Sequence, residues 1–264
     1  LDHCCTSTVD NEMLYGKVEF FTPWFDIKLL ASDQQIRTGT VLDFDGSGRQ
    51  GVGISGVGFS GDTQTAEIQL ISNVESWGSD WLRWIVGVYK FEGITGFSEP
   101  GDRIEIHANL LSPILAPLGG VFSTLNGLGL NLLPQGLGTG VLYSKYSVAT
   151  DSESIYGQAT VTLTEWFDIT LGLRYQDEGR ELLYSELGAL VSDDEITLFE
   201  YDYAVTQTGE RVEPQKSTVT TSPKISFELR PFDEETLVYL SYQEATKSGT
   251  FNGLAVRGKD QVLA

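Results

Sequence analysis

Residues 154–176 read SIYGQATVTLTEWFDITLGLRYQ, and this stretch decides the fold. Apolar and polar residues alternate from Ile155 to Leu163 and again from Ile169 to Tyr175. A period of two is typical of a β-strand, because successive side chains point to opposite faces. The short connection at residues 164–166 joins the two strands as a hairpin. Each strand is about ten residues long, which crosses a bilayer when the strand is tilted, so we predict a transmembrane hairpin.

The same pattern recurs elsewhere in the chain. Residues 14–20 and 25–32 alternate in the same way around a short turn. Two further pairs of strands are predicted, one at 65–70 and 81–91, the other at 224–230 and 236–245. In the 81–91 strand the alternation is less regular, since Trp81 and Ile85 fall on its polar side. Self-similarity indicates repeated units, and it is closest in two turns: Thr22, Trp24, Phe25, Asp26 and Ile27 match Thr164, Trp166, Phe167, Asp168 and Ile169.

The eight predicted strands form four hairpins whose connections alternate between short and long. The long ones are a polar glycine-rich stretch at 43–62 and two excursions at 93–150 and 177–218. A soluble β-sandwich does not require this rhythm, whereas an outer-membrane barrel has brief periplasmic turns and long outer loops. Each strand also keeps a polar face with charges such as Lys17, Glu67 and Arg174. We therefore predict an all-β fold, an antiparallel transmembrane β-barrel segment.

Composition limits the possible partners. The 264 residues carry 37 acidic and 17 basic side chains, a formal net charge of -20, which argues against a nucleic-acid partner because phosphates would be repelled. The adjacent Cys4 and Cys5 lack the further ligands that a zinc site needs. The apolar stretch 110–133 contains two prolines and several glycines, so we expect a collapsed loop, with room for one short helix, rather than a membrane helix.

Several stretches resemble the barrel of TonB-dependent outer-membrane receptors, the siderophore-receptor-like group in particular. The matching sequences are VLDFDGSG at 41–48, QTAEIQLIS at 64–72, LRWIVGVYKFEG at 82–93, SIYGQATVTLTEWFDITLGLRYQDEGR at 154–180 and SPKISFELRPFDEETLVYLSYQEATKSGTFNG at 222–253. The last two of these, in this order and at this spacing, are the most specific.

The resemblance implies a 22-stranded barrel plugged by an amino-terminal domain. On that basis, residues 1–264 are an internal part of the barrel, without the plug and the closing carboxyl-terminal strands. The whole protein would lie in the Gram-negative outer membrane, bind a scarce nutrient, most often a ferric siderophore or other iron complex, and admit it when the TonB complex acts through the plug. Two alternatives stay open: a small closed barrel serving as an adhesin or anchor, and a secreted carbohydrate-binding β-sandwich.

The candidate site residues are aromatic and lie near the short turns. We expect a membrane-interface girdle, in contact with outer-membrane lipid, made of Trp24, Phe25, Trp77, Trp81, Trp166, Phe167 and Phe232. No catalytic, cofactor-binding or metal-binding residue is assigned, and we expect no enzyme activity.

Other motifs are weaker. Asp43, Asp45 and Ser47 are spaced like part of a calcium loop, but the downstream glutamate is missing, so a polar loop is the simpler interpretation. His107 is expected in a loop without a nucleophile signature, and Glu234 and Glu235 are expected in a solvated turn. Residues 247–253 are expected at the upper end of a strand. Inward-facing cations could meet an anionic chelate or the plug, or pair with carboxylates of neighbouring strands; these are Arg174, Lys224 and Arg230, with Glu19, Glu67 and Glu228 as partners.

Overall fold

The computed structural model describes residues 6–43, 52–97, 102–109, 139–191, 194–201, 215–231, 236–249 and 251. These residues form ten strands and, within the same ranges, no helix long and apolar enough to cross a membrane. The strands are β1 Thr6–Phe21, β2 Asp26–Asp43, β3 Val52–Ile71, β4 Leu82–Phe97, β5 Arg103–Asn109, β6 Thr139–Thr164, β7 Phe167–Val191, β8 Asp194–Tyr201, β9 Gln215–Leu229 and β10 Val238–Gln243.

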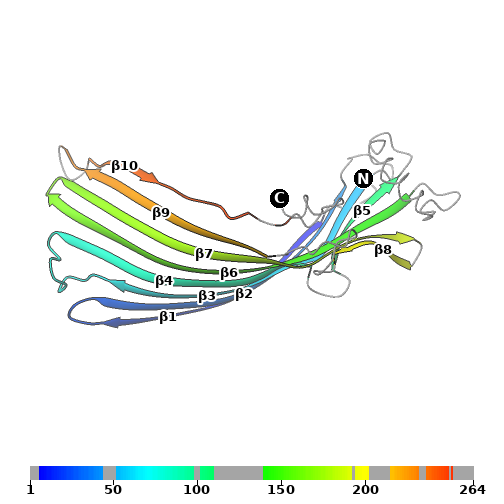
Figure 1. Cartoon of the computed structure of the whole chain (residues 1–264), viewed down its shortest axis with the longest axis horizontal. Coiled ribbons are helices and arrows are strands. Elements are labelled where there is room, and N and C mark those ends of the chain that lie inside the picture. The colour runs from blue at the N-terminus through cyan, green and yellow to red at the C-terminus, as the bar shows by residue number, and fades with distance from the viewer. Residues whose placement is uncertain are drawn as a thin grey trace.

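One antiparallel sheet contains all ten strands, in the order β1-β2-β3-β4-β6-β7-β9-β10 (Figure 1). The remaining two strands, β5 and β8, occupy places in the sheet where another strand has ended. β5 pairs with β3 and β6, the same neighbours as β4, and β8 pairs with β7 beyond the end of β9. The sheet therefore has eight positions, two of them interrupted, which confirms the predicted eight strands in four hairpins. It is an open sheet with β1 and β10 at its edges.

The turns that join β1 to β2, β3 to β4 and β6 to β7 lie at one end of the sheet, on the left in Figure 1. In the first turn the amide N–H of Phe25 donates to Thr22 Oγ1 at 3.2 Å. Backbone bonds tie two turns to the adjacent strand: Thr162 donates to the Trp81 carbonyl and Arg230 to the Trp166 carbonyl, each at 2.8 Å. The turn end is therefore held across strands by backbone hydrogen bonds as well as within each hairpin.

The strands extend much further from the turns than the sequence pattern predicted. β6 has 26 residues and β7 has 25, and the two predicted excursions contain the end of β4, all of β5 and β8, and the start of β6 and β9. The glycine-rich stretch 43–62 likewise contains the first half of β3. The predicted long connections therefore extended too far into the strands, because pairing continues where both faces are polar, as in the run Thr150 to Ser154, and polar faces give no alternation.

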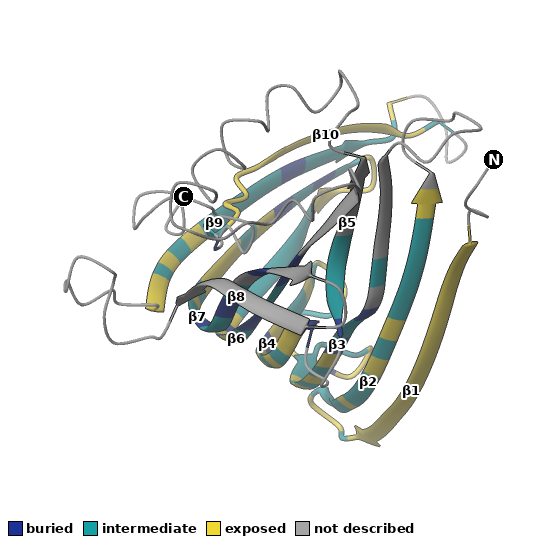
Figure 2. Cartoon of the chain, turned by 90° about the vertical axis from the view of Figure 1, so that its right-hand side faces the viewer, coloured by how far each residue is buried: buried dark blue, intermediate teal, exposed yellow. Residues whose placement is uncertain are grey.

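One face of the sheet exposes apolar side chains and the other buries polar ones, which is the reverse of a soluble protein. We call the face that carries Ile155, Leu171 and their cross-strand partners the outer face, and the face that carries Thr170 and Ser226 the inner face. Leu171 is 55% exposed, whereas Ser226 is 2% exposed. Small polar residues are packed on the inner face, and large apolar ones are left open on the outer face. Figure 2 shows the curved wall with stretches of different burial following one another along its strands. A sandwich core would require the reverse.

A small apolar core lies at the level where β4 ends, far from the turns. Phe97 packs edge-on against Phe59 at 5.6 Å and against Tyr146 at 5.7 Å between ring centroids. Val148 and Leu182 are buried beside this level. Gly96 is at φ 142 and its Cβ would meet the Tyr146 carbonyl, so the chain leaves β4 at a position that requires glycine.

Candidate functional site

The outer face has an apolar band next to the turns. The stretch of β7 from Phe167 to Tyr175 is nine residues long, and every second residue in it, the outward-facing one, is apolar or aromatic. Nine residues at about 3.3 Å per residue span roughly 30 Å, and a tilt of about 40° reduces this to about 23 Å, close to the lipid-facing band of a membrane barrel. The partners of these residues continue the band across the sheet, including Ile27, Leu29, Ile68, Leu70, Val86, Val88, Ile155, Val161, Ile225 and Leu240.

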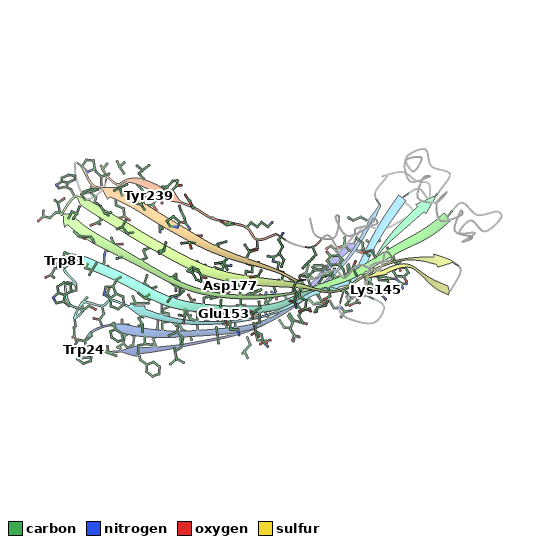
Figure 3. The ribbon with its side chains drawn as sticks, in the orientation of Figure 1. Trp24, Trp81, Lys145, Glu153, Asp177 and Tyr239 are labelled. Carbon is green, nitrogen blue, oxygen red and sulfur yellow. The ribbon has the colours of Figure 1, made fainter. Side chains whose placement is uncertain are left out.

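Six of the seven predicted girdle aromatics lie at the turn end of the sheet, and Phe232 lies outside the described residues. Trp24 is 70% exposed and Trp77 is 79% exposed. Trp77 packs edge-on against Trp81 at 5.5 Å, and Trp166 stacks on Phe167 at 5.8 Å. Phe25 contacts Trp84 at 6.3 Å. Figure 3 shows Trp24 and Trp81 at this end, together with Tyr239 of β10.

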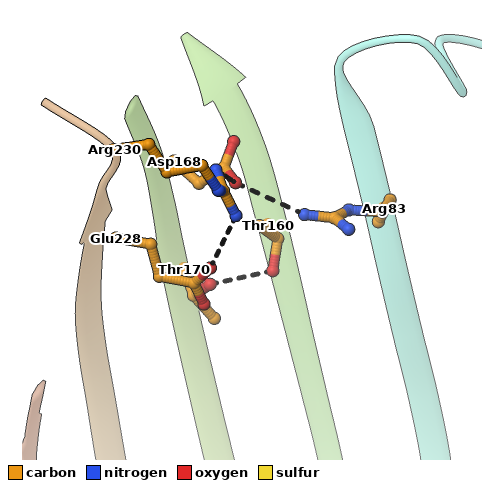
Figure 4. Close-up of polar contacts among 6 residues, drawn as sticks. All are labelled: Arg83, Thr160, Asp168, Thr170, Glu228 and Arg230. Carbon is orange, nitrogen blue, oxygen red and sulfur yellow. Dashed lines mark hydrogen bonds and ion pairs between the residues drawn. The ribbon is translucent and has the colours of Figure 1, made fainter. Parts of the chain in front are cut away.

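The inner face carries an ionic cluster close to the turns (Figure 4). Arg230 Nη1 lies 3.1 Å from Asp168 Oδ2, and Arg83 Nη2 lies 3.6 Å from the same oxygen. Arg230 also reaches Glu228 at 3.4 Å. The Asp168 side chain is 4% exposed but that of Arg83 is 64% exposed, so the carboxylate is enclosed while one cation stays open to the inner space. Four strand positions, β4, β6, β7 and β9, bring these residues and the Thr160–Thr170 hydrogen bond together.

A second polar group lies further along the inner face, among β3, β4, β6 and β7. The Tyr156 hydroxyl donates to Glu67 at 2.5 Å across the β4 position. This reach is possible because Gly87, the cross-strand partner of Tyr156, has no side chain: an added Cβ would lie 2.5 Å from the tyrosine ring. The guanidinium of Arg174 lies 5.8 Å from the centre of the Tyr89 ring. Large rings over glycine, and a cation over a ring, stabilise such a wall without an apolar core.

Of the three inner-face cations, only Arg230 pairs with a carboxylate across strands among the described residues, and its partner Asp168 was not one of those predicted. Arg230 also pairs with Glu228, but this residue is two positions away along the same chain segment rather than on a neighbouring strand. Lys224 instead donates to Gln158 at 3.0 Å, and no carboxylate of a described residue lies within ion-pair distance of Arg174. The carboxylates expected as partners bind elsewhere: Glu67 accepts from Tyr156, and Glu19 pairs with Lys17 at 3.1 Å and Lys28 at 3.5 Å.

Charge is divided unequally between the faces. Beside the apolar band, the described part of the inner face is close to neutral: its basic residues are Lys17, Lys28, Arg83, Arg174, Lys224 and Arg230, and its acidic residues are Glu19, Asp26, Glu67, Asp168 and Glu228. The whole chain has a net charge of -20. Most of its negative charge therefore lies away from this part of the inner face.

The far end of the sheet has its own polar contacts. Tyr143 is 1% exposed, donates to Glu186 at 2.7 Å, and lies under the Arg103 guanidinium at 5.2 Å. Lys145 pairs with Glu186 at 2.8 Å. Burial raises the pKa of the Tyr146 hydroxyl. The pKa of Tyr184 is raised mainly by burial and further by Asp102 and Glu186. The phenols of Tyr146 and Tyr184 therefore stay neutral at pH 7.

No functional site is assigned to the weaker sequence motifs. Asp43 ends β2, whereas Asp45, Ser47, Glu234, Glu235, both cysteines and residues 110–138 lie outside the described residues. His107 lies in β5 rather than in a loop, because β5 fills the position that β4 leaves. Residues 247–253 were expected at the upper end of a strand, but Lys247 to Gly249 are not in a strand. Within the described ranges, no group of three or more His, Cys, Asp or Glu side chains could hold a metal ion.

An open antiparallel wall with an apolar band outside, a polar inner face, short turns at one end and long strands at the other defines a segment of an outer-membrane β-barrel. The sequence profile of the family described as "TonB dependent receptor-like, beta-barrel" matches residues 23–261. The chain belongs to this family, whose members are Gram-negative outer-membrane transporters rather than enzymes.

Among solved structures the chain is similar to the ferric yersiniabactin uptake receptor FyuA from Yersinia pestis, with 12% identity and a TM-score of 0.48. The similarity covers 86% of this chain and 26% of that receptor, so the chain spans about a quarter of its length. No curated protein matches the chain significantly.

Proposed function

We propose that this chain is the barrel segment of a receptor that imports a scarce nutrient with energy from TonB, and that the nutrient is a ferric siderophore or another iron complex. The distribution of charge on the inner face carries this proposal. A strongly acidic wall would repel an anionic chelate, whereas a near-neutral wall with open cations admits one. The open cations are Arg83, at 64% side-chain exposure, and Arg174, which stacks on Tyr89.

The proposal includes residues 1–264 as part of one larger barrel. β1 and β10 each present an unpaired edge in the described sheet, and a membrane strand needs its backbone groups paired on both sides. Further strands of the same barrel would supply these partners. A plug domain would then lie against the polar inner face, and TonB would act through that plug.

The aromatic residues at the turns would mark the periplasmic boundary of the membrane. Trp24, Trp77, Trp81 and Trp166 are amphipathic, and such rings favour the headgroup level of a bilayer. Phe25, Phe167 and Phe232 complete the proposed girdle. The long strands at the other end, including β5 and β8, would then project outside the cell and capture the nutrient.

A growth experiment tests the function. The complete receptor gene is expressed in a Gram-negative strain that lacks its own ferric siderophore receptors, and growth under iron limitation is measured with a panel of ferric siderophores, with and without TonB. We expect at least one complex to restore growth, only with TonB. Combined Arg83→Gln and Arg174→Gln changes should slow uptake, while Lys90→Gln on the outer face should not. If no iron complex restores growth although the receptor is folded at the surface, the iron assignment is wrong.

A further inference from the structure

Three seams between neighbouring hairpins have no tight turn to fix their register. β2 pairs with β3, β4 with β6 and β7 with β9, and the chain connects each of these pairs through the far end of the sheet (Figure 1). Sliding one hairpin past the next by two residues, about 6.8 Å, keeps every apolar side chain on the outer face. Backbone hydrogen bonds would re-form in the shifted register as well. Side-chain contacts across the seam are therefore what can distinguish the observed register from a shifted one.

The two turns with matching sequences make such contacts. We call their shared sequence, residues 22–27 and residues 164–169, the turn motif. One copy lies beside the seam between β2 and β3, and the other lies beside the seam between β7 and β9. The third seam, between β4 and β6, follows a turn that lacks the motif, and there an aromatic ring fits over a glycine of the partner strand instead.

The first copy of the turn motif accepts three side-chain hydrogen bonds from the next hairpin. The carboxamide nitrogen of Asn73, in the β3–β4 turn, donates to the Thr22 carbonyl at 2.7 Å and to Asp26 Oδ1 at 2.9 Å. The hydroxyl of Ser76, a residue that is 5% exposed, donates to the Trp24 carbonyl. Both donor side chains are short, so a shift of two residues would separate all three pairs.

The second copy repeats this arrangement with an ion pair. Arg230 Nη1 donates to Asp168 Oδ2 at 3.1 Å, and the backbone N–H of Arg230 donates to the Trp166 carbonyl at 2.8 Å. Asp168 and Trp166 are the counterparts of Asp26 and Trp24 in the first copy. In both copies the aspartate and the tryptophan carbonyl therefore accept from the following hairpin.

The donor also occupies the same place at both seams. The cross-strand partner of the motif aspartate is Ile71 at the first seam and Glu228 at the second. The donor is the second residue after this partner in each case, Asn73 and Arg230. Two copies of one sequence thus make the same contact at the same offset, which indicates a shared role.

We propose that the turn motif is a register lock: its aspartate and the carbonyls beside it accept side-chain hydrogen bonds from the following hairpin, and these bonds set the height at which that hairpin joins the barrel. The apolar pattern decides which face meets lipid, whereas the lock decides how far each hairpin slides along its neighbour. Inner-face contacts depend on register, so the lock also places the inner-face residues. The inference rests on the barrel family and not on the identity of the nutrient.

Disulfide cross-linking of the complete receptor in outer membranes measures the register directly. Pairs of cysteines are introduced in a cysteine-free background, and an added oxidant links the pairs that lie opposite each other. At the first seam Thr63→Cys is combined with Gln34→Cys, its partner in the observed register. Ser32→Cys and Ile36→Cys replace Gln34→Cys to detect the two registers that are shifted by two residues.

Removing the donors should shift the register at this seam. We expect combined Asn73→Ala and Ser76→Ala changes to raise the ratio of shifted to native cross-link at least about tenfold, because three side-chain hydrogen bonds that favour the native register are lost. Asn73→Ala alone should give a smaller rise, and it keeps the test open if the double variant does not fold. Ser79→Ala removes a bond inside the same turn, to the Val74 carbonyl at 2.8 Å, and should leave the ratio unchanged.

The seam between β7 and β9 provides a crossed control. Here Gln176→Cys is combined with Thr220→Cys for the native register, and with Thr218→Cys or Ser222→Cys for the shifted ones. Replacing the two donors of the first seam should leave these cross-links as they are.

Combined Asp168→Ala and Arg230→Ala changes should raise the shifted cross-links of the second seam and not those of the first. Three results would overturn the proposal. The first is an unchanged ratio in a folded receptor that lacks the donors of the seam. The second is an equal rise with Ser79→Ala, and the third is a rise at both seams from a change at one of them.

Discussion

Adjacent leucines of β2 offer a direct comparison of the two faces. Leu29 pairs with Val18 and Ile68 on the outer face, whereas Leu30 pairs with Lys17 and Glu67 on the inner face. Arginine at Leu29 would face hydrocarbon in the row of the band that ends at Tyr175, away from the midplane, which costs about 1–3 kcal/mol. Arginine at Leu30 would meet a carboxylate and a lysine beside an aqueous space, so we expect a change within about 1 kcal/mol.

The expected difference between Leu29→Arg and Leu30→Arg is about 1–2 kcal/mol, a factor of roughly 5 to 30 in the folding equilibrium constant. The assay is equilibrium unfolding of the complete barrel by urea in phospholipid vesicles, followed by tryptophan fluorescence and by the heat-modifiable mobility of the folded form. Leu29→Ala separates the loss of side-chain volume from the introduced charge. Equal destabilisation by the two arginines, or a larger effect at Leu30, would refute the assignment of faces.

Three further changes test local features of the wall in the same unfolding assay. Gly58→Ala should cost about 1–3 kcal/mol, because Gly58 is at φ 75 and its Cβ would overlap the Asp102 carboxylate, whereas Gly56→Ala meets nothing within 4 Å and should be nearly neutral. Gly87→Ala should displace the Tyr156 ring, and a double-mutant cycle with Tyr156→Ala, which removes the ring, should show coupling of about 0.5–3 kcal/mol. Additive effects would show that the ring does not lie over the glycine. Asp168→Ala should cost about 1–2 kcal/mol, a value reduced by the exposure of its arginine partners, and Asp168→Asn should cost less; a neutral alanine variant would mean that the cluster does not stabilise the sheet.

The part of the fold that faces lipid was predictable from the sequence. Alternation from Ile155 to Leu163 and from Ile169 to Tyr175 identified strands, faces and the turn between them, because hydrocarbon demands an apolar side chain at each second position. The inward Leu30 and Ile85 reduced the contrast without hiding it. Beyond the band, water meets both faces, so paired strands no longer show alternation of apolar and polar residues. The halves of β6 and β7 that lie far from the turns were therefore predicted as loops.

The contacts of the inner face depend on register, which a single sequence does not define. Asp168 and Arg230 are 62 residues apart and meet because Asp168 is the cross-strand partner of Glu228. Tyr156 reaches Glu67 because Gly87 lies between their strands. A glycine opposite an aromatic residue is a usable signal once two strands are aligned, but the alignment has to come first.

The most direct measurement is a spin-label scan of β7 in the complete receptor, reconstituted in lipid bilayers. Single cysteines replace residues 168–176 in a background in which Cys4 and Cys5 are serine, and the accessibility of each label to oxygen and to a water-soluble nickel complex is measured. The structure predicts a period of two, with oxygen favoured at Ile169, Leu171, Leu173 and Tyr175 and the nickel complex favoured at the positions between them. A profile without alternation, or one with the two reagents exchanged, would contradict the assignment of this sheet to a barrel wall with lipid on its apolar face.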